Sequence, residues 1–113
     1  MDILCQNHTS SVVKITLQKD GIILGRAFIY LIKNELHQQP YALLEDVFIE
    51  ETFRGQGHGA EMVKAAINKA KELGCYKIIG TSRNSRIKIH RFYQKLGFTE
   101  YGKEFRLDIK ENQ

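Results

Sequence analysis

The residues best suited to chemistry lie in one glycine-rich stretch, Arg54-Gly55-Gln56-Gly57-His58-Gly59. Glycines at alternate positions let a backbone adopt positive φ and bring several amide N–H groups close to one ligand. A helical pattern starts at the same place, and the unpaired N–H groups and positive dipole of a helix start also attract anions. Arg54 adds a positive charge. The stretch is a candidate phosphate-binding loop, and its alternative interpretation is a plain linker between a strand and a helix.

A strand before this loop and a helix after it must hold it in place. Residues 41 to 49 have strand character, and Gly74 is a C-cap candidate for the helix. Residues 75 to 81 then resemble a short buried strand. Such a strand–helix–strand unit is a right-handed crossover with parallel strands, so the loop lies at the carboxyl end of the first strand, where open α/β sheets bind ligands. The expected core positions of the helix are Val63, Ala66, Ile67, Ala70 and Leu73.

Two strands are predicted before this unit. Residues 12 to 18 alternate apolar and polar side chains, and Asp20-Gly21 is typical of a hairpin turn. Ile22–Ile32 follows, and its continuous apolar character predicts burial on both faces, with Gly25 as a bulge.

A helix and a strand are predicted after it. The helix covers residues 86 to 96 and is stopped by Gly97. In residues 98 to 109, Phe105, Leu107 and Ile109 alternate with charged residues, which predicts a last strand. Residues 110 to 113 are expected to fray.

Composition predicts one small globular domain over residues 1–113, with a formal net charge of +4. No apolar run approaches the roughly 18 residues of a membrane span, and the start is a poor signal peptide, so we expect a cytoplasmic protein. Cys5 and Cys75 lack CxxC spacing and are expected to be reduced packing residues. No metal site is expected, because the four histidines have no partner at ligand spacing: His8, His37, His58 and His90.

Two common glycine-loop families do not fit. Gly55, Gly57 and Ala60 loosely satisfy G-x-G-x-x-G/A, but five residues separate the strand from the loop, and Gly80 stands where a dinucleotide-binding fold needs an acid. A P-loop is excluded because no Gly-Lys-Ser/Thr follows the glycines.

The same residues resemble motif A of the GNAT acyltransferase superfamily, Q/R-x-x-G-x-G/A, with Arg54, Gly57 and Gly59 at the defining places. Residues 47 to 49 resemble that family's bulged strand, and HRFYQKLGF, residues 90 to 98, resembles its last conserved helix-to-strand junction. The resemblance covers roughly residues 15 to 109. It implies an α/β (α+β) fold with a mixed sheet, built from an antiparallel hairpin and a parallel β-α-β unit, and two main helices.

The resemblance also implies an N-acetyltransferase that uses acetyl-CoA as cosubstrate. An acceptor amine would attack the thioester directly in a ternary complex, and Tyr93 matches the tyrosine that protonates the leaving thiolate. The backbone of Val47, Phe48 and Ile49 would pair with the pantetheine arm. The pyrophosphate would lie on the amides of Arg54, Gly55, Gln56, Gly57, His58, Gly59 and Ala60.

Two departures from the family pattern matter. A typical member has a strand and two helices before the hairpin, whereas at most eleven residues precede it here. With these amino-terminal helices missing, we expect the acceptor wall to be absent or supplied by a partner, and we favour a homodimer. The family asparagine that contacts pantetheine falls at Arg86, with Asn84 two residues earlier, so both are candidates.

The general base is open between Glu45, Asp46 and a water relay. The two carboxylates lie on opposite faces of a strand unless a bulge intervenes, and we favour Glu45. The basic cluster at residues 83 to 91 could hold the 3′-phosphate of CoA or be a solvated helix face.

Two other functions are weighed against this one. The first is a CoA-binding module without turnover, and the second is a basic nucleic-acid-binding domain that uses residues 83 to 91. The nucleic-acid alternative is weaker because the sequence has no RRM, KH or helix-turn-helix signature. The acceptor stays open between a small amine, an amino sugar, an amino acid and a protein lysine.

Overall fold

A computed structural model of the chain describes residues 1–110 and divides it into two compact units, Met1–Gly80 and a second that begins at Thr81. A single domain over the whole chain stays a prediction. The first unit contains β1 (Val12–Lys19), β2 (Ile22–Ile32), β3 (Tyr41–Ile49), the short 3₁₀ helix η1 (Glu51–Phe53), α1 (His58–Glu72) and β4 (Ile78–Gly80). The second unit contains α2 (Ile87–Lys95).

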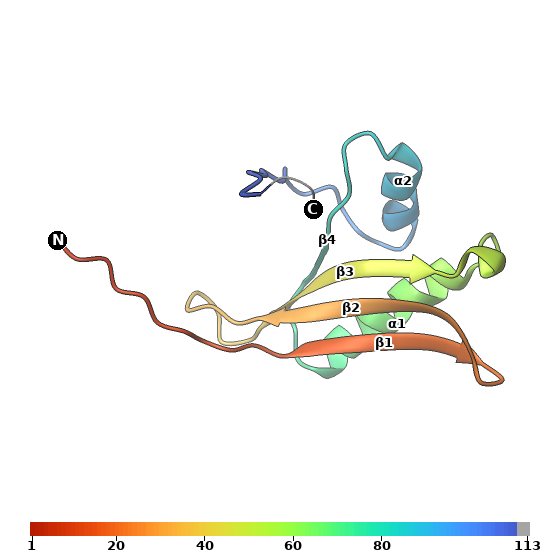
Figure 1. The fold of residues 1–113 in the computed structure, drawn as a ribbon, viewed down its shortest axis with the longest axis horizontal. Coiled ribbons are helices and arrows are strands. Elements are labelled where there is room, and N and C mark those ends of the chain that lie inside the picture. The colour runs from red at the N-terminus through yellow and green to blue at the C-terminus, as the bar shows by residue number, and fades with distance from the viewer. Residues whose placement is uncertain (111–113) are drawn as a thin grey trace. The chain divides into compact units, whose positions relative to one another are not determined.

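The strands form a mixed sheet in the order β1-β2-β3-β4 (Figure 1). β1 with β2 and β2 with β3 are antiparallel, whereas β3 and β4 are parallel. Asp20 and Gly21 have φ values of 51° and 78°, as a two-residue hairpin turn requires. The predicted mixed sheet is therefore confirmed, although β4 is shorter than the predicted strand over residues 75 to 81.

The core of the first unit lies between α1 and one face of the sheet (Figure 1). Its buried side chains are Leu24, Ala27, Ile29, Ala42 and Leu44 from the strands and Met62, Val63, Ala66 and Ala70 from α1. Leu73 was wrongly expected in this core, because it caps the end of the helix and is exposed. The expected burial of β2 on both faces is also wrong, since Tyr30 on the face away from α1 is exposed.

Gly25 lies on β2 where the neighbouring backbone of β3 leaves no room for a side chain. Leu17 pairs with Gly25 and Gln18 with Ile23, so one extra residue of β2 forms the predicted bulge beside Gly25. A Cβ atom at Gly25 would lie 2.6 Å from both the Phe48 carbonyl oxygen and Ile49 Cδ1. Only glycine fits there without a shift of the β3 backbone.

In the second unit, α2 begins after Arg86 and is followed by Gly97 with a φ of 100°, as predicted. The predicted last strand is wrong: in the described part of the chain, residues 98 to 109 belong to no strand. Phe105, Leu107 and Ile109 are 91%, 83% and 84% exposed. Alternation shows which side chains could share a face, but a strand also needs a neighbour that accepts its backbone hydrogen bonds.

Three smaller predictions can be followed in the structure. Cys5 is exposed and therefore no packing residue, whereas Cys75 is half-buried, and burial raises the pKa of its thiol. Fraying is expected of residues 110 to 113, and the last three of these lie outside the described residues. Among the described residues, no helix has the length and apolar character needed to cross a membrane.

The contact at Gly25 yields a stability prediction. Gly25→Ala should lower the free energy of unfolding by about 1–3 kcal/mol, because the added methyl group forces β2 and β3 apart. Gly102→Ala is the control, since a Cβ atom there meets nothing within 4 Å. Urea unfolding of both variants measures the difference, and equal stability of the two would contradict the tight approach.

Candidate active site

The glycine loop connects η1 to α1 and leaves open space beside its backbone. Gly55 and Gly57 have φ values of 78° and 85°, and a Cβ atom on either would meet nothing within 4 Å. Gly57 is the N-cap of α1, and no side chain caps the helix start there. Gly59 is already the second residue of α1, so the positive φ that we expected of all three glycines holds for two. The loop can present backbone N–H groups to an anion.

Arg54 ties this loop to the end of β3. Its Nε atom donates a hydrogen bond to the Ile49 carbonyl oxygen at 2.8 Å, and its guanidinium carbon lies 5.2 Å from the centre of the Phe48 ring. Besides carrying the positive charge noted in the sequence, the Arg54 side chain thus connects the start of the loop to the end of β3.

His58 opens α1, and its side chain is 18% exposed. Its Nδ1 atom lies 3.3 Å from Glu61 Oε1. That contact does not have the geometry of a hydrogen bond, which leaves Nδ1 buried without a hydrogen-bond partner among the described residues. Among the described residues, no group of three or more His, Cys, Asp or Glu side chains could hold a metal ion, and this includes the surroundings of His58.

A bulge interrupts β3 just before the segment expected to bind pantetheine. Phe28 pairs with Glu45 and Arg26 pairs with Phe48, so two residues of β3, Asp46 and Val47, stand opposite one residue of β2. Asp46 has a φ of 52°, in the left-handed region that residues with a Cβ rarely adopt. The structure thus contains the bulge that the family resemblance implied.

The bulge places the two candidate bases on the same face of the sheet. Glu45 shares the face of its partner Phe28, which lies away from α1, because cross-strand partners point the same way. Asp46 reaches Arg26 on that face. The sequence left this open, since it predicted opposite faces only for a strand without a bulge.

Asp46 forms an ion pair with Arg26 that also involves Phe48. Arg26 Nε and Nη2 donate to the two carboxylate oxygens at 2.8 and 3.2 Å. Its guanidinium carbon lies 4.7 Å from the centre of the Phe48 ring. The hydrogen bond from Arg26 holds the pKa of the Asp46 carboxyl below its usual value, which disfavours Asp46 as a proton acceptor. Glu45 forms no such ion pair in the described chain.

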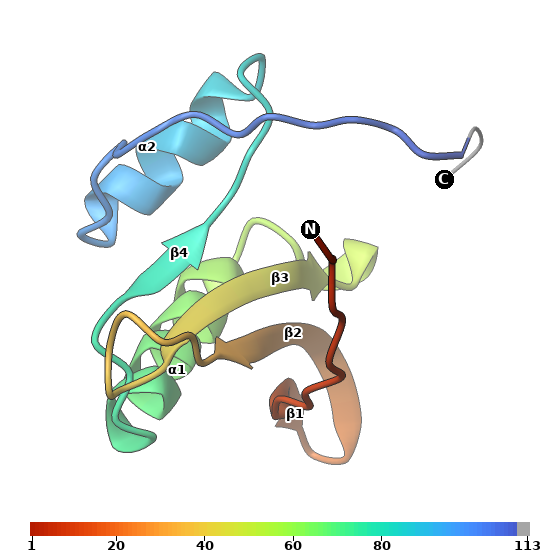
Figure 2. The same cartoon turned by 90° about the vertical axis from the view of Figure 1, so that its left-hand side faces the viewer.

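Within residues 1–110, the edge of β3 away from β2 is unpaired beyond the first part of the strand. β4 pairs with β3 only from Ala42 to Leu44, whereas β3 continues to Ile49. Figure 2 shows the two strands diverging after this short ladder. Residues 45 to 49 therefore offer backbone groups along which an extended ligand could add as a further strand.

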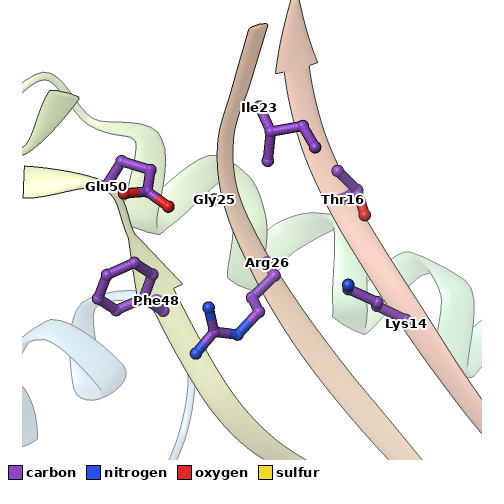
Figure 3. Close-up of a pocket in the computed structure, with 7 residues that line it drawn as sticks. All are labelled: Lys14, Thr16, Ile23, Gly25, Arg26, Phe48 and Glu50. Carbon is purple, nitrogen blue, oxygen red and sulfur yellow. The ribbon is translucent and has the colours of Figure 1, made fainter.

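A pocket of about 110 Å³ lies beside these residues on the face away from α1 (Figure 3). In Figure 3 the side chains of Arg26 and Phe48 project from this face, with Lys14 on the neighbouring strand and Glu50 at the end of β3. Its charged lining carries both signs and suits a small polar group. The lining residues are Lys14, Thr16, Ile23, Gly25, Arg26, Phe48 and Glu50.

The other predicted site residues belong to the second unit. Tyr93 is half-buried on α2, and the centres of the Phe92 and Phe98 rings lie 5.5 and 5.1 Å from its own. His90 Nε2 lies 2.8 Å from the Arg83 carbonyl oxygen, which ties the segment before α2 to that helix. Asn84 and Arg86 lie exposed in this segment. The glycine loop, the bulge and Glu45 thus lie in the first unit. The other predicted site residues, Asn84, Arg86 and Tyr93, lie in the second.

The chain is similar in sequence to known proteins. A family model described as Acetyltransferase (GNAT) family matches residues 2–98. A glucosamine 6-phosphate N-acetyltransferase of Trypanosoma brucei brucei is 33% identical over 66 residues, which cover 58% of this chain and 43% of that protein. The chain therefore spans less than half the length of this curated relative.

Two solved structures share the fold. A transcriptional regulator from Bacillus halodurans C-125 has a TM-score of 0.79 at 29% identity, covering 87% of this chain and 66% of that one. The glucosamine-6-phosphate N-acetyltransferase of Arabidopsis thaliana has a TM-score of 0.76 at 22% identity, covering 88% of this chain and 67% of that one. The second likeness shows the fold alone.

The lowered pKa of Asp46 predicts a pH dependence of stability. The carboxylate form is favoured in the folded state, so its contribution is present above the usual pKa of 3.8 and is lost as the pH falls through the lower folded value. Asp46→Asn cannot respond in this way. The difference in urea midpoint between wild type and Asp46→Asn should shrink as the pH falls below 3.8, and a difference that grows with acid would contradict the ion pair.

Proposed function

Because the chain belongs to the GNAT family of acetyltransferases, we propose that it transfers the acetyl group of acetyl-CoA to an amine. One observation carries this proposal: the strand with the unpaired edge, β3, leads through η1 to the glycine loop. An extended arm that ends in an anionic group matches both features. The pantetheine and pyrophosphate of CoA form such a ligand.

The cosubstrate would be held mainly by backbone. The amides of residues 54 to 60 would take the pyrophosphate, and the open space beside Gly55 and Gly57 supports this role. The backbone of residues 47 to 49 would pair with pantetheine. Asn84 and Arg86 stay candidates for a further contact to that arm.

The reaction would proceed by direct attack. The amine nitrogen adds to the thioester carbonyl carbon, the C–S bond breaks, and the CoA thiolate leaves with a proton from the Tyr93 hydroxyl. The nitrogen must lose a proton to form the amide, and we assign its removal to Glu45, directly or through a water molecule. Glu45 is better suited than Asp46 to accept this proton, because the Asp46 carboxylate already accepts two hydrogen bonds from Arg26.

We propose a small amine as acceptor, with glucosamine 6-phosphate as the first compound to test, since a relative is named for it. The pocket supports a polar acceptor, because Lys14, Arg26 and Glu50 are part of its lining. A protein lysine is the alternative acceptor. A homodimer and a cytoplasmic location stay predictions of the sequence.

The competing functions make different predictions. A CoA-binding module without turnover would bind the cosubstrate and acetylate nothing. A nucleic-acid-binding domain would use the exposed Arg83, Arg86 and Arg91 of the second unit, and its affinity would fall steeply with salt.

Cosubstrate binding is testable without knowing the acceptor. CoA at about 100 times its dissociation constant should stabilise the fold by roughly 2.7 kcal/mol, which raises the melting temperature on the order of ten degrees. Gly57→Val should abolish this rise, because its side chain enters the space assigned to the pyrophosphate.

Gly74→Val is the matched control for that experiment. Gly74 lies just beyond the other end of α1 with a φ of 78°, against 85° for Gly57, and a Cβ atom there also meets nothing within 4 Å. Both variants should lose similar stability, but Gly74→Val should keep the CoA shift. Loss of the shift in both, or in neither, would contradict the assignment of the loop.

The role of Tyr93 predicts a selective loss of turnover. Tyr93→Phe keeps the ring packing against Phe92 and Phe98. Turnover with acetyl-CoA should fall on the order of a hundredfold, the usual contribution of one general acid. The CoA-dependent melting shift should persist. Tyr101→Phe, which changes an exposed tyrosine, is the control, and unchanged turnover in Tyr93→Phe would leave Tyr93 a packing residue.

A further inference from the structure

The bulge in β3 contains a residue other than glycine whose backbone is in the left-handed region. Asp46 has a φ of 52°. A side chain with a Cβ disfavours the left-handed region, although aspartate tolerates it better than most residues. A bulge built on such a residue needs other contacts to make it the preferred conformation.

Arg26 supplies contacts on both sides of the bulge. Its guanidinium binds the Asp46 carboxylate through Nε and Nη2 at 2.8 and 3.2 Å. The same group lies over the Phe48 ring, and Arg26 is also the backbone partner of Phe48. A planar guanidinium that binds a carboxylate through two nitrogens fixes orientation as well as distance. Arg26 therefore connects the residue that starts the bulge with the residue that follows it.

The register of β3 depends on these contacts. Without the extra residue, every residue of β3 beyond Glu45 would shift by one position against β2 and present its side chain to the opposite face. The edge of β3 away from β2 would then present different N–H and C=O groups at residues 47 to 49. Gly25 suits the observed register as well, because a Cβ atom there would lie 2.6 Å from the Phe48 carbonyl oxygen and from Ile49 Cδ1.

We propose that Arg26 and Asp46 are positioning residues of the CoA site. Together they hold the β3 bulge and thereby orient the backbone that binds pantetheine. The assignment of that backbone rests on the proposed function. An exposed ion pair usually contributes little to global stability, and these side chains are 38% and 52% exposed. The pair should therefore change global stability only slightly, and its main effect should appear in the geometry of the site.

The first test removes Arg26 and follows the bulge in the absence of ligand. In Arg26→Ala, amide hydrogen exchange at residues 45 to 49 should be about tenfold faster or more, while the amides of α1 keep their wild-type rates. The dissociation constant for CoA, measured by calorimetry, should rise on the order of tenfold. Arg106→Ala is the control, because it breaks another exposed ion pair, Arg106 to Asp108 at 2.7 Å, in the second unit. It should change neither quantity.

The second test separates the ion pair from the backbone conformation. Asp46→Ala loses the carboxylate and keeps a Cβ atom in the left-handed region, whereas Asp46→Gly loses the carboxylate and adopts that region without strain. CoA affinity should therefore be lowest in Asp46→Ala and partly rescued in Asp46→Gly. Asp46→Asn, which has one acceptor oxygen for the two Arg26 nitrogens, should lie between wild type and Asp46→Ala. Asp20→Ala carries the same strain in the hairpin turn, at a φ of 51°, and should leave CoA affinity unchanged.

The outcomes separate this inference from the proposed function. If wild type binds CoA while Arg26→Ala matches it in both exchange and affinity, the inference is overturned and the function stands. If Asp46→Gly binds CoA no better than Asp46→Ala, the claim that the bulge conformation matters is overturned. If wild type binds no CoA, the proposed function fails, and the positioning role fails with it.

Discussion

The structure of the candidate site depends on how the backbone of β3 is paired. On one side β3 is hydrogen-bonded to β2 along most of its length, but on the other side β4 accompanies it only from Ala42 to Leu44. Unpaired backbone groups in a partly buried strand favour any ligand that can complete the ladder. The incomplete pairing of β3 therefore leaves a free backbone edge, which we propose as the edge that binds pantetheine, and we propose that the bulge at Asp46 sets its orientation.

The same strand also places the anion-binding loop. β3 ends at Ile49, where Arg54 returns to hydrogen-bond its carbonyl group, and the loop then opens α1. α1 buries Met62, Val63 and Ala66 against the sheet, so the helix start is held by the core of the first unit. Elements that stabilise this unit thus also fix both parts of the proposed cosubstrate site. A binding site made of backbone requires little of its side chains beyond glycine in the loop and a fixed strand register.

The sequence predicted β2 and β3 with their observed bounds, because each is a continuous pattern closed by turn residues. The loop, the hairpin turn and the ends of both helices were indicated by glycines, and Gly21, Gly55, Gly57, Gly74 and Gly97 have the positive φ that glycine adopts readily. The helices themselves were predicted from apolar residues at helical spacing. The last strand was predicted wrongly, because alternation at Phe105, Leu107 and Ile109 contains no information about a partner strand. The shared face of Glu45 and Asp46 depends on a bulge that only the pairing register reveals. Arg26 was missed, although one signal existed: it is the only charged residue in the apolar stretch Ile22–Ile32.

The central claim is that this chain turns acetyl-CoA over with an amine. The most direct measurement incubates the protein with acetyl-CoA and a panel of amines that includes glucosamine 6-phosphate, other amino sugars, amino acids and lysine-containing peptides. Free thiol release and the mass of the acetylated product are followed together. The account predicts thiol release that requires one class of amine and equals the amount of N-acetyl product. Tight CoA binding with no amine-dependent thiol release from any member of the panel would contradict it and identify a binding module.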